Sequence, residues 1–289
     1  MSRAALAQIL DHLRAEPSRT WSIIITVYGD AIVPRGGTVW LGTLLAFFKA
    51  LDISEGVVRT AMSRLASDGW LERHKVGRNS FYRLAEKGRE TFREAAEHIY
   101  APRTPRWNGR FDLLLLDAGA DRDAARGALE AAGFGAPAPG VWIAPSGAPL
   151  PAAAEGALRL EAGGDGATSR ALAARSWPLD ATAEAYARFL AAFEPLRAAL
   201  ATGGSLSDVD AMVARVLLIH EYRRIVLRDP ILPAQVLPPD WPGAAARALC
   251  ADVYGRVLAP SERWLDQNAV DASGAPLPPD EKIFSRFKD

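Results

Sequence analysis

The segment of residues 54–65 constrains the fold of this chain most, because its side chains separate into two opposed faces at the helical period of about 3.6 residues. One face is apolar and consists of Val58, Ala61, Met62 and Leu65. The other face carries small residues and hydrogen-bond donors, namely Gly56, Arg59, Thr60, Ser63, Arg64 and Ser67. Ser54 stands at the amino end, where a hydroxyl oxygen can accept from a free backbone N–H, so we expect it to cap the helix.

The polar face of this segment fits the major groove of DNA. Guanidinium groups pair there with guanine edges or phosphates, and hydroxyl groups bond to either. The sequence therefore predicts that four residues contact DNA: Arg59, Thr60, Ser63 and Arg64. The alternative is an ordinary amphipathic surface helix, which also shows two faces.

The residues after this segment favour the DNA-binding interpretation. Residues 70–76 and 80–84 are two strand-like runs joined by Gly77-Arg78-Asn79, where Gly and Asn supply the positive φ angles of a tight hairpin. We expect Arg78 and Asn79, at the hairpin tip, to reach a minor groove or phosphates. The alternative for Arg78 is a basic tip that is only solvated.

The residues before the segment complete a known pattern. Residues 21–31 and 41–50 are apolar at helical spacing, and the turn Pro34-Arg35-Gly36-Gly37 separates them. The order helix, helix, helix, hairpin predicts a winged helix-turn-helix. A further helix, at residues 86–100, is expected to follow the hairpin.

The distribution of charge supports this assignment. The chain has a formal net charge of 0, but residues 1–106 hold 16 Lys and Arg against 11 Asp and Glu. Cationic surface belongs on the element that meets phosphate, because counterion release supplies much of the affinity for DNA. An excess of five is modest, so we expect a homodimer that brings two copies of the module to a two-fold operator in double-stranded DNA.

Composition excludes several classes of protein. The 289 residues are 49% hydrophobic and 24% charged, which is ordinary for a globular protein of two or three domains. We expect a cytoplasmic protein without membrane contact, because no apolar run approaches the roughly 20 residues of a membrane span and the first residues lack a signal-peptide core. Cys250 is the single cysteine, which excludes an intrachain disulfide and a cysteine-rich metal site. No cofactor or metal is expected.

The rest of the chain divides into two parts. The prolines of residues 101–106 predict a linker, after which strands at 111–117, 140–145 and 157–161, helices at 121–132 and near Ser169, and a last strand near Ser176-Trp177 predict a ferredoxin-like βαββαβ unit. From Asp180 onward the pattern is helical, with helices expected at 208–228, capped by Ser207, and at 244–258. The tail of residues 270–289 is expected to be loosely held. The predicted fold class is α+β, with domains at 1–100, 101–178 and 179–289.

Three groups of residues resemble the PaaX family of bacterial transcriptional repressors. They are Val27-Tyr28-Gly29-Asp30 with Pro34-Arg35-Gly36-Gly37 and Val58-Arg59-Thr60-Ala61; Gly69-Trp70-Leu71 through Gly77-Arg78-Asn79-Ser80-Phe81-Tyr82-Arg83-Leu84; and His220-Glu221-Tyr222-Arg223-Arg224 with Arg228-Asp229-Pro230 and Asp240-Trp241-Pro242-Gly243. The resemblance implies an amino-terminal winged helix, a central ferredoxin-like domain similar to Cas2 proteins, and a helical carboxy-terminal domain. It also implies a homodimeric repressor of phenylacetate catabolism genes, which phenylacetyl-CoA releases from the operator.

The residues themselves suggest where such an aryl-acyl-CoA effector binds. Its phosphates favour arginine clusters, and its aryl group favours aromatic surfaces. The candidate constellation consists of His220, Tyr222, Arg223, Arg224, Arg228 and Trp241. The alternative is structural, with Glu221, Arg224 and Asp229 forming ion pairs and Trp241 holding the proline-rich connection against the helix.

Enzymes and scaffold proteins are the alternatives to a DNA-binding protein. His220-Glu221 lacks the second histidine that a zincin motif needs four residues later, since Arg224 stands there, so we expect no zinc hydrolase. Asp117 ends the first central strand where a Cas2-like nuclease places a metal-binding carboxylate, although Asp is also common where turns begin. A non-enzymatic dimeric scaffold is the other alternative. We expect no enzyme.

Overall fold

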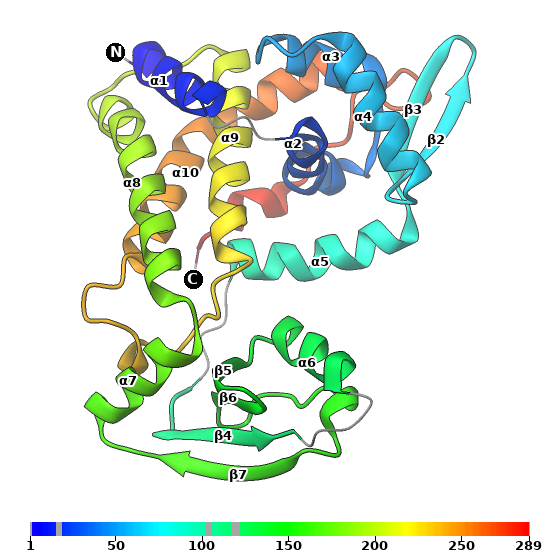
Figure 1. Ribbon diagram of the computed structural model, residues 1–289. Coiled ribbons are helices and arrows are strands. Elements are labelled where there is room, and N and C mark those ends of the chain that lie inside the picture. The colour runs from blue at the N-terminus through cyan, green and yellow to red at the C-terminus, as the bar shows by residue number, and fades with distance from the viewer. Residues whose placement is uncertain (1, 16–18, 102–105, 117–121, 289) are drawn as a thin grey trace. The chain divides into compact units, whose positions relative to one another are not determined.

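The computed structural model describes residues 2–15, 19–101, 106–116 and 122–288 (Figure 1). Helices and two antiparallel sheets make up these parts of the chain, so the predicted α+β class is confirmed. The chain divides into two compact units. The first unit combines Met1–Ala101 with Ala187–Leu227 and Ala244–Asp289, and the second combines Pro102–Tyr186 with Arg228–Gly243. The predicted linker lies largely outside the described residues.

The first unit begins with a helix that was not predicted, followed by helices that follow the predicted pattern. Helix α1 spans Ser2–Ala15, and α2 spans Thr20–Val27 and continues into the π-helical turn Tyr28–Ile32. The short strand β1, Thr38–Trp40, leads to α3, Leu41–Lys49, and then to α4, Glu55–Ser67. The predicted turn at residues 34–37 is confirmed, because Gly36 and Gly37 both adopt the positive φ angles that close it.

The hairpin after α4 belongs to a three-stranded sheet in the order β1-β3-β2. Strand β2 is Leu71–Val76 and β3 is Asn79–Leu84, and the pairing of Val76 with Asn79 leaves Gly77 and Arg78 as a two-residue turn. Gly77 has a φ of 59°, which a residue with a β-carbon rarely adopts. The hairpin projects from the unit beside α4 (Figure 1), and helix α5, Glu86–Tyr100, follows it.

The core of the first unit is built around one helix from the carboxy-terminal half of the chain. Helix α9, Asp208–Val226, is buried on every side from Ala211 to His220, as expected for a helix without a polar face. It packs against α1, α2, α3 and α5. Ser207 caps α9 as predicted, because its hydroxyl accepts from the backbone N–H of Asp210. Residues 2–100 therefore share their core with α9.

Two more long helices, α8 and α10, lie before and after α9 in the chain. Helix α8 spans Leu179–Ala201, and the boundary between the two units falls inside it. Helix α10 spans Gly243–Asn268, so the expectation that it ends near Leu258 is wrong. It continues past Pro260 because the side chains of the next turns are buried, namely Ser261, Glu262, Trp264 and Leu265. Tertiary packing here overrides the local cost of a proline.

A buried charge cluster holds distant parts of the first unit together. It consists of Asp30, Arg35, Arg215, Glu262 and Arg286. Arg215 and Asp30 are 0% exposed and lie 2.5 Å apart, from Nε to Oδ2. Charges removed from water persist only when they are paired and hydrogen-bonded, as these are.

The carboxy-terminal segment takes part in this core, so the expectation of a loosely held tail is wrong. Leu277 and Ile283 are buried, and Arg286 pairs with Asp30. The ring of Phe287 lies against Tyr100, Tyr222 and Tyr254. Buried side chains and a buried ion pair outweigh the low helical propensity that made this segment look unstructured.

The second unit contains a four-stranded antiparallel sheet in the order β5-β6-β4-β7. Its elements are β4 Arg110–Leu115, α6 Arg122–Ala131, β5 Gly135–Ala138, β6 Val141–Pro145, β7 Leu158–Gly163 and α7 Gly166–Ser176. The two-residue period of the strands divides the apolar side chains between the faces. Phe111 and Ile143 pack with Trp177 on one face, and Leu114 and Trp142 pack with Leu129 on the other.

The expected last strand near Ser176-Trp177 is wrong. Ser176 ends helix α7, and the indole of Trp177 packs into the core while its Nε1 donates to the carbonyl oxygen of Gly133 at 3.0 Å. The fourth strand of the sheet is β5 instead. Its sequence, Gly135-Ala136-Pro137-Ala138, has small residues and a proline, which do not signal a strand.

Candidate functional site

Helix α4 has the two faces that its sequence predicts. Val58 and Met62 are 0% exposed and Leu65 is buried beside them. The predicted DNA-contacting residues of the opposite face are all exposed: Arg59, Thr60, Ser63 and Arg64. The structure thus brings these four side chains together on one solvent-facing surface, which we call the α4 polar face.

The ion pairs on the α4 polar face are exposed and weak. Arg59 pairs with Glu55 at 3.2 Å, and Arg64 lies 3.6 Å from Asp68, with both arginines more than half exposed. Exposed pairs of this kind contribute little, about 0–1 kcal/mol. The expected side-chain cap is wrong, because the hydroxyl of Ser54 makes no capping hydrogen bond, although its backbone has the extended conformation of a cap.

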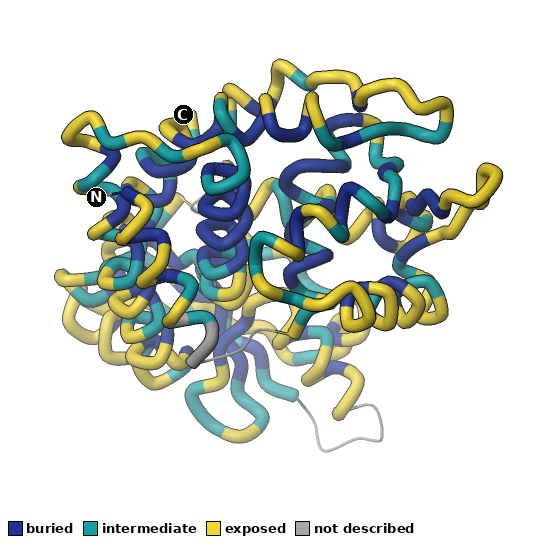
Figure 2. The backbone as a smooth tube through the Cα atoms, turned by 90° about the horizontal axis from the view of Figure 1, so that it is seen from above, coloured by how far each residue is buried: buried dark blue, intermediate teal, exposed yellow. Residues whose placement is uncertain are grey.

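The hairpin places additional cations beside this helix. Arg78 is exposed in the turn, and Asn79 is exposed at the start of β3. All residues from Glu72 to Asn79 are exposed, and Figure 2 shows this outer part of the hairpin in yellow. Arg73 and Lys75 therefore add to the basic surface, and the sequence prediction missed them. The signal for them is that the four residues of β2 between Leu71 and Val76 are all polar, which indicates that this part of the strand faces solvent.

The four predicted effector residues of helix α9 have different environments. Tyr222 is buried, with its ring packed on Phe189 and Phe287. His220 is 0% exposed, and its Nδ1 lies 3.0 Å from the hydroxyl oxygen of Thr26. Burial, together with the charges of Arg223 and Arg224, lowers the pKa of His220 to about 3, so this imidazole is neutral. The Nε2 atom has no hydrogen-bond partner among the described residues.

The two arginines of this group also differ. Arg224 is 48% exposed and lies 3.3 Å from Glu221, as the structural alternative expected. Arg223 is half-buried, and it donates from Nε to the hydroxyl of Thr26 at 2.7 Å and from Nη2 to the hydroxyl and carbonyl of Ser22. Helical spacing placed these side chains in one cluster, but the structure gives each of them different neighbours.

The remaining two candidates, Arg228 and Trp241, belong to the second unit. Arg228 is exposed. Trp241 is half-buried and packs edge-on against Tyr186 of α8, with ring centroids 6.0 Å apart. The hydroxyl of Tyr186 donates to Asp229 at 2.7 Å. Trp241 thus holds the proline-rich connection against a helix of its own unit.

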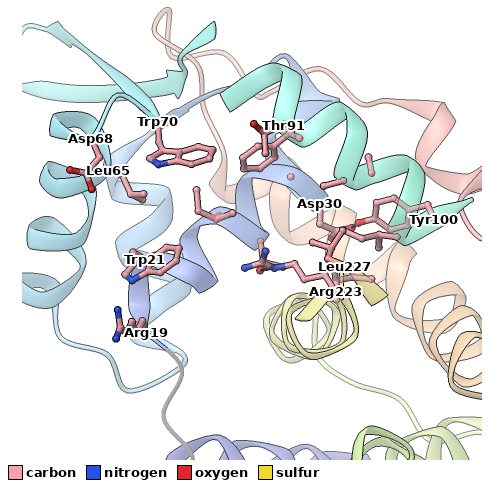
Figure 3. Close-up of a pocket in the computed structure, with 18 of the residues that line it drawn as sticks. Arg19, Trp21, Asp30, Leu65, Asp68, Trp70, Thr91, Tyr100, Arg223 and Leu227 are labelled. Carbon is pink, nitrogen blue, oxygen red and sulfur yellow. Dashed lines mark hydrogen bonds between the residues drawn. The ribbon is translucent and has the colours of Figure 1, made fainter. Parts of the chain in front are cut away.

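The first unit contains a pocket of about 370 Å³ that no single stretch of sequence indicates. Helices α2, α4, α5 and α9 line it (Figure 3). Arg223 is the predicted effector residue that lines this pocket, and Arg64 of the α4 polar face lines it too. Three aromatic side chains also line it: Trp21, Trp70 and Phe92. Their positions in the sequence are far apart, so only the fold shows that they share a cavity.

The described residues show no cluster of metal ligands. No group of three or more His, Cys, Asp or Glu side chains among them is arranged to hold a metal ion. Asp117, the candidate nuclease carboxylate, lies outside the described residues. Cys250 is buried, as expected for a core residue, and burial raises the pKa of its thiol. Within the described ranges, none of the helices has the length and apolar character to cross a membrane.

Comparison with known proteins agrees with this arrangement. Residues 19–88 match the family model described as PaaX-like protein, and residues 177–267 match the model of the PaaX-like protein C-terminal domain. The transcriptional repressor PaaX of Escherichia coli strain K12 is 36% identical, over 95% of this chain and 92% of that protein. An uncharacterized protein from Mycobacterium tuberculosis has a similar solved structure, with a TM-score of 0.54 and 25% identity over 91% of this chain and 97% of that one. The chain therefore belongs to the PaaX family of transcriptional regulators.

Proposed function

We propose that this chain represses transcription by binding an operator through a winged helix-turn-helix formed by residues 20–84. The observation that supports this most is the α4 polar face, which lies beside a basic hairpin. In this proposal Arg59, Thr60, Ser63 and Arg64 enter the major groove, because guanidinium and hydroxyl groups can pair with base edges there. Arg78 and Asn79 meet the phosphates or the minor groove beside it.

A homodimer is part of this proposal. One module carries only a modest excess of basic charge, and phosphate contacts supply a large share of the affinity for DNA. Two modules on a two-fold operator double the number of these contacts. Cross-linking or light scattering of the purified protein tests this part, with a monomer at micromolar concentration as the contrary result.

The genes that this repressor controls are proposed from its family. The residues shared with the family support regulation of phenylacetate or related aromatic catabolism, with release by an aryl-acyl-CoA such as phenylacetyl-CoA. We also propose three functional domains, with boundaries after residues 100 and 178. The central domain is of the ferredoxin-like, Cas2-related class, and the helical domain after residue 178 serves dimerisation and effector binding. The strand order β5-β6-β4-β7 supports the assignment of the central domain. No catalytic step is proposed.

A gel-shift titration tests the proposed function. The probe is the promoter upstream of the catabolic genes that neighbour the gene for this chain, with random DNA of the same length as the competitor. We expect sequence-dependent binding that weakens as salt increases, because released counterions drive the association. Equal affinity for promoter and random DNA at moderate salt contradicts the proposal.

A further inference from the structure

The pocket in the first unit has the composition of a site for a small aromatic molecule. Its volume, about 370 Å³, falls within the range of about 300–1000 Å³ that is typical of ligand pockets. The apolar part of its lining consists of Trp21, Ile25, Trp70, Phe92, Ile99 and Ile219. Trp21 remains 39% exposed and Leu227, which also lines the pocket, 40% exposed. Large apolar side chains are thus left in contact with solvent where a ligand can cover them.

Arg223 supplies a cationic group on the α9 side of this pocket. Its side chain reaches from α9 toward Trp21 (Figure 3), and Thr26 and Ser22 fix its orientation. Its hydrogen-bond partners among the described residues are the neutral groups of Thr26 and Ser22, although the carboxylates of Asp30 and Asp68 also line the pocket. Burial and the neighbouring Arg224 lower the pKa of this guanidinium to about 10. A half-buried guanidinium whose hydrogen bonds go to neutral groups can still donate to an anion or a carbonyl oxygen.

Two more arginines stand at the same pocket. Arg19 and Arg64 line it and are exposed to solvent. Figure 3 shows Arg19 beside Trp21, at the edge of the aromatic wall. Exposed guanidinium groups at the mouth of an apolar pocket suit a ligand whose far end carries phosphates.

We propose that this pocket is the effector site of the repressor. The aryl group of an aromatic acyl compound packs against Trp21, Trp70 and Phe92, and its carbonyl or carboxylate oxygen accepts a hydrogen bond from Arg223. The nucleotide end of a CoA thioester stays outside, near Arg19 and Arg64. This assignment rests on the proposed release by an aryl-acyl effector. Of the six effector residues expected from the sequence, it keeps Arg223.

The location of the pocket explains how a ligand acts on DNA binding. Leu65, in the last turn of α4, and Asp68, directly after the helix, line it, so a bound ligand touches the proposed DNA-reading helix itself. Trp70 connects this helix to the hairpin through its backbone. Its backbone N–H donates to the carbonyl of Leu65 at 2.9 Å, and its carbonyl accepts from the backbone N–H of Ala85 at 3.0 Å. A ligand that fits one position of α4 better than another shifts the equilibrium between them. Arg64 is also shared between DNA and ligand.

Calorimetric titration of the full-length protein without DNA tests the site. The three probes are phenylacetyl-CoA, free phenylacetate and CoA. Arg223→Met removes the guanidinium, and Ala96→Trp fills the pocket from α5, whose Ala96 lines it. Their matched controls are Arg197→Met, an exposed arginine of α8 paired with Glu194, and Glu97→Trp, which adds an indole on the exposed side of α5.

We expect the wild-type protein and both controls to bind phenylacetyl-CoA with similar affinity. Arg223→Met and Ala96→Trp should each weaken binding by about 10- to 100-fold, the usual effect of losing a charge-assisted hydrogen bond or the space for a ring. Equal affinity for phenylacetate identifies the free acid as the ligand of the same pocket, whereas preference for phenylacetyl-CoA identifies the thioester. The assignment is overturned if both variants bind like the wild type, or if the wild type binds none of the three probes.

If Ala96→Trp does not fold, a second measurement tests whether the ligand binds in this pocket. Trp21→Phe and Trp70→Phe retain ring shape, and each should lose part of the change in tryptophan fluorescence that phenylacetyl-CoA produces in the wild type. An unchanged response in both variants overturns the assignment. Failure of the wild-type protein to bind its operator contradicts the proposed function instead, and the ligand titration still decides the pocket. Conversely, if phenylacetyl-CoA releases the wild type and Ala96→Trp equally well, only the pocket assignment fails.

Discussion

Nη1 of Arg286 lies 2.8 Å from Oδ1 of Asp30, which joins the carboxy-terminal segment to the π-helical turn after α2. Asp30 also receives hydrogen bonds from the hydroxyls of Tyr100, at 2.5 Å, and Tyr254, at 3.0 Å. Burial raises the pKa of Asp30, but the charges of Arg215 and Arg286 and the hydrogen bonds from Tyr100 and Arg215 outweigh it and hold the pKa below its ordinary value. The carboxylate is therefore ionised inside the core.

Neutralising Asp30 should destabilise the first unit. Asp30→Asn retains the shape but leaves the positive charge of two buried guanidinium groups incompletely compensated. We expect a loss of about 3–5 kcal/mol in the free energy of unfolding, as for other buried pairs deprived of one partner. Urea unfolding followed by circular dichroism measures it. Glu90→Gln, which breaks an exposed pair with Arg93, is the control and should change stability by less than about 0.5 kcal/mol. Equal stability of the two variants contradicts this role of Asp30.

His220 should make the stability depend on pH in the acidic range. Its pKa is about 3 in the folded protein and near 6.5 in the unfolded chain. Between these values the unfolded chain binds a proton at this histidine and the folded protein does not. The contribution of His220 to the free energy of unfolding is therefore complete above pH 6.5, and it is lost as the pH falls toward 3. One proton corresponds to a slope of up to about 1.4 kcal/mol per pH unit.

Urea unfolding at pH 6.5, 5.5 and 4.5 measures this slope. His220→Gln should reduce the slope of the free energy of unfolding against pH by an amount that corresponds to at most one proton. His74→Gln, at an exposed position on β2, is the control and should leave the slope unchanged. If His220→Gln keeps the full slope of the wild type, the proton is taken up at another group.

Substitutions on the α4 polar face should change which DNA sequences are bound. Arg59→Ala and Ser63→Ala each remove an exposed donor, and a base contact carries about 1–3 kcal/mol of discrimination. The measurement is a gel shift against a panel of operators that differ at single base pairs. Variants that keep the parental order of preference show that these side chains do not read bases.

Arg78 should act on affinity rather than on sequence preference. Arg78→Ala is expected to weaken binding to all sequences to a similar degree, because a contact with phosphate or with the minor groove carries little sequence information. The slope of log affinity against log salt concentration should decrease by about 1 for each lost phosphate contact. An unchanged salt dependence contradicts a phosphate contact at Arg78.

The elements that the sequence predicts well are those with a local signal. The faces of α4 follow from the spacing of Val58, Met62 and Leu65, and the hairpin follows from Gly77 between two strand-like runs. Strand β5 carries no such signal, because small residues and Pro137 form a strand only when a neighbouring strand pairs with them. The continuation of α10 past Pro260 likewise depends on burial of residues that follow the proline.

The candidate site was harder to predict for a related reason. Helical spacing correctly indicates that His220, Arg223 and Arg224 are near one another on α9, but it assumes that one side of the helix faces a ligand. Helix α9 is surrounded by other helices, so neighbouring positions meet different partners, and His220 is buried against Thr26. The pocket joins residues near positions 20, 70, 95 and 220, and no pattern in a single stretch connects them.

The central position of α9 also governs how the polypeptide is made. During synthesis, the helices of residues 2–100 leave the ribosome long before α9 does. Their apolar faces therefore stay exposed until α9, more than a hundred residues downstream, has been made. A product of premature termination near residue 100 therefore lacks the helix that completes its core. We therefore expect early termination of translation to yield a chain that is degraded rather than a stable fragment that competes for the operator.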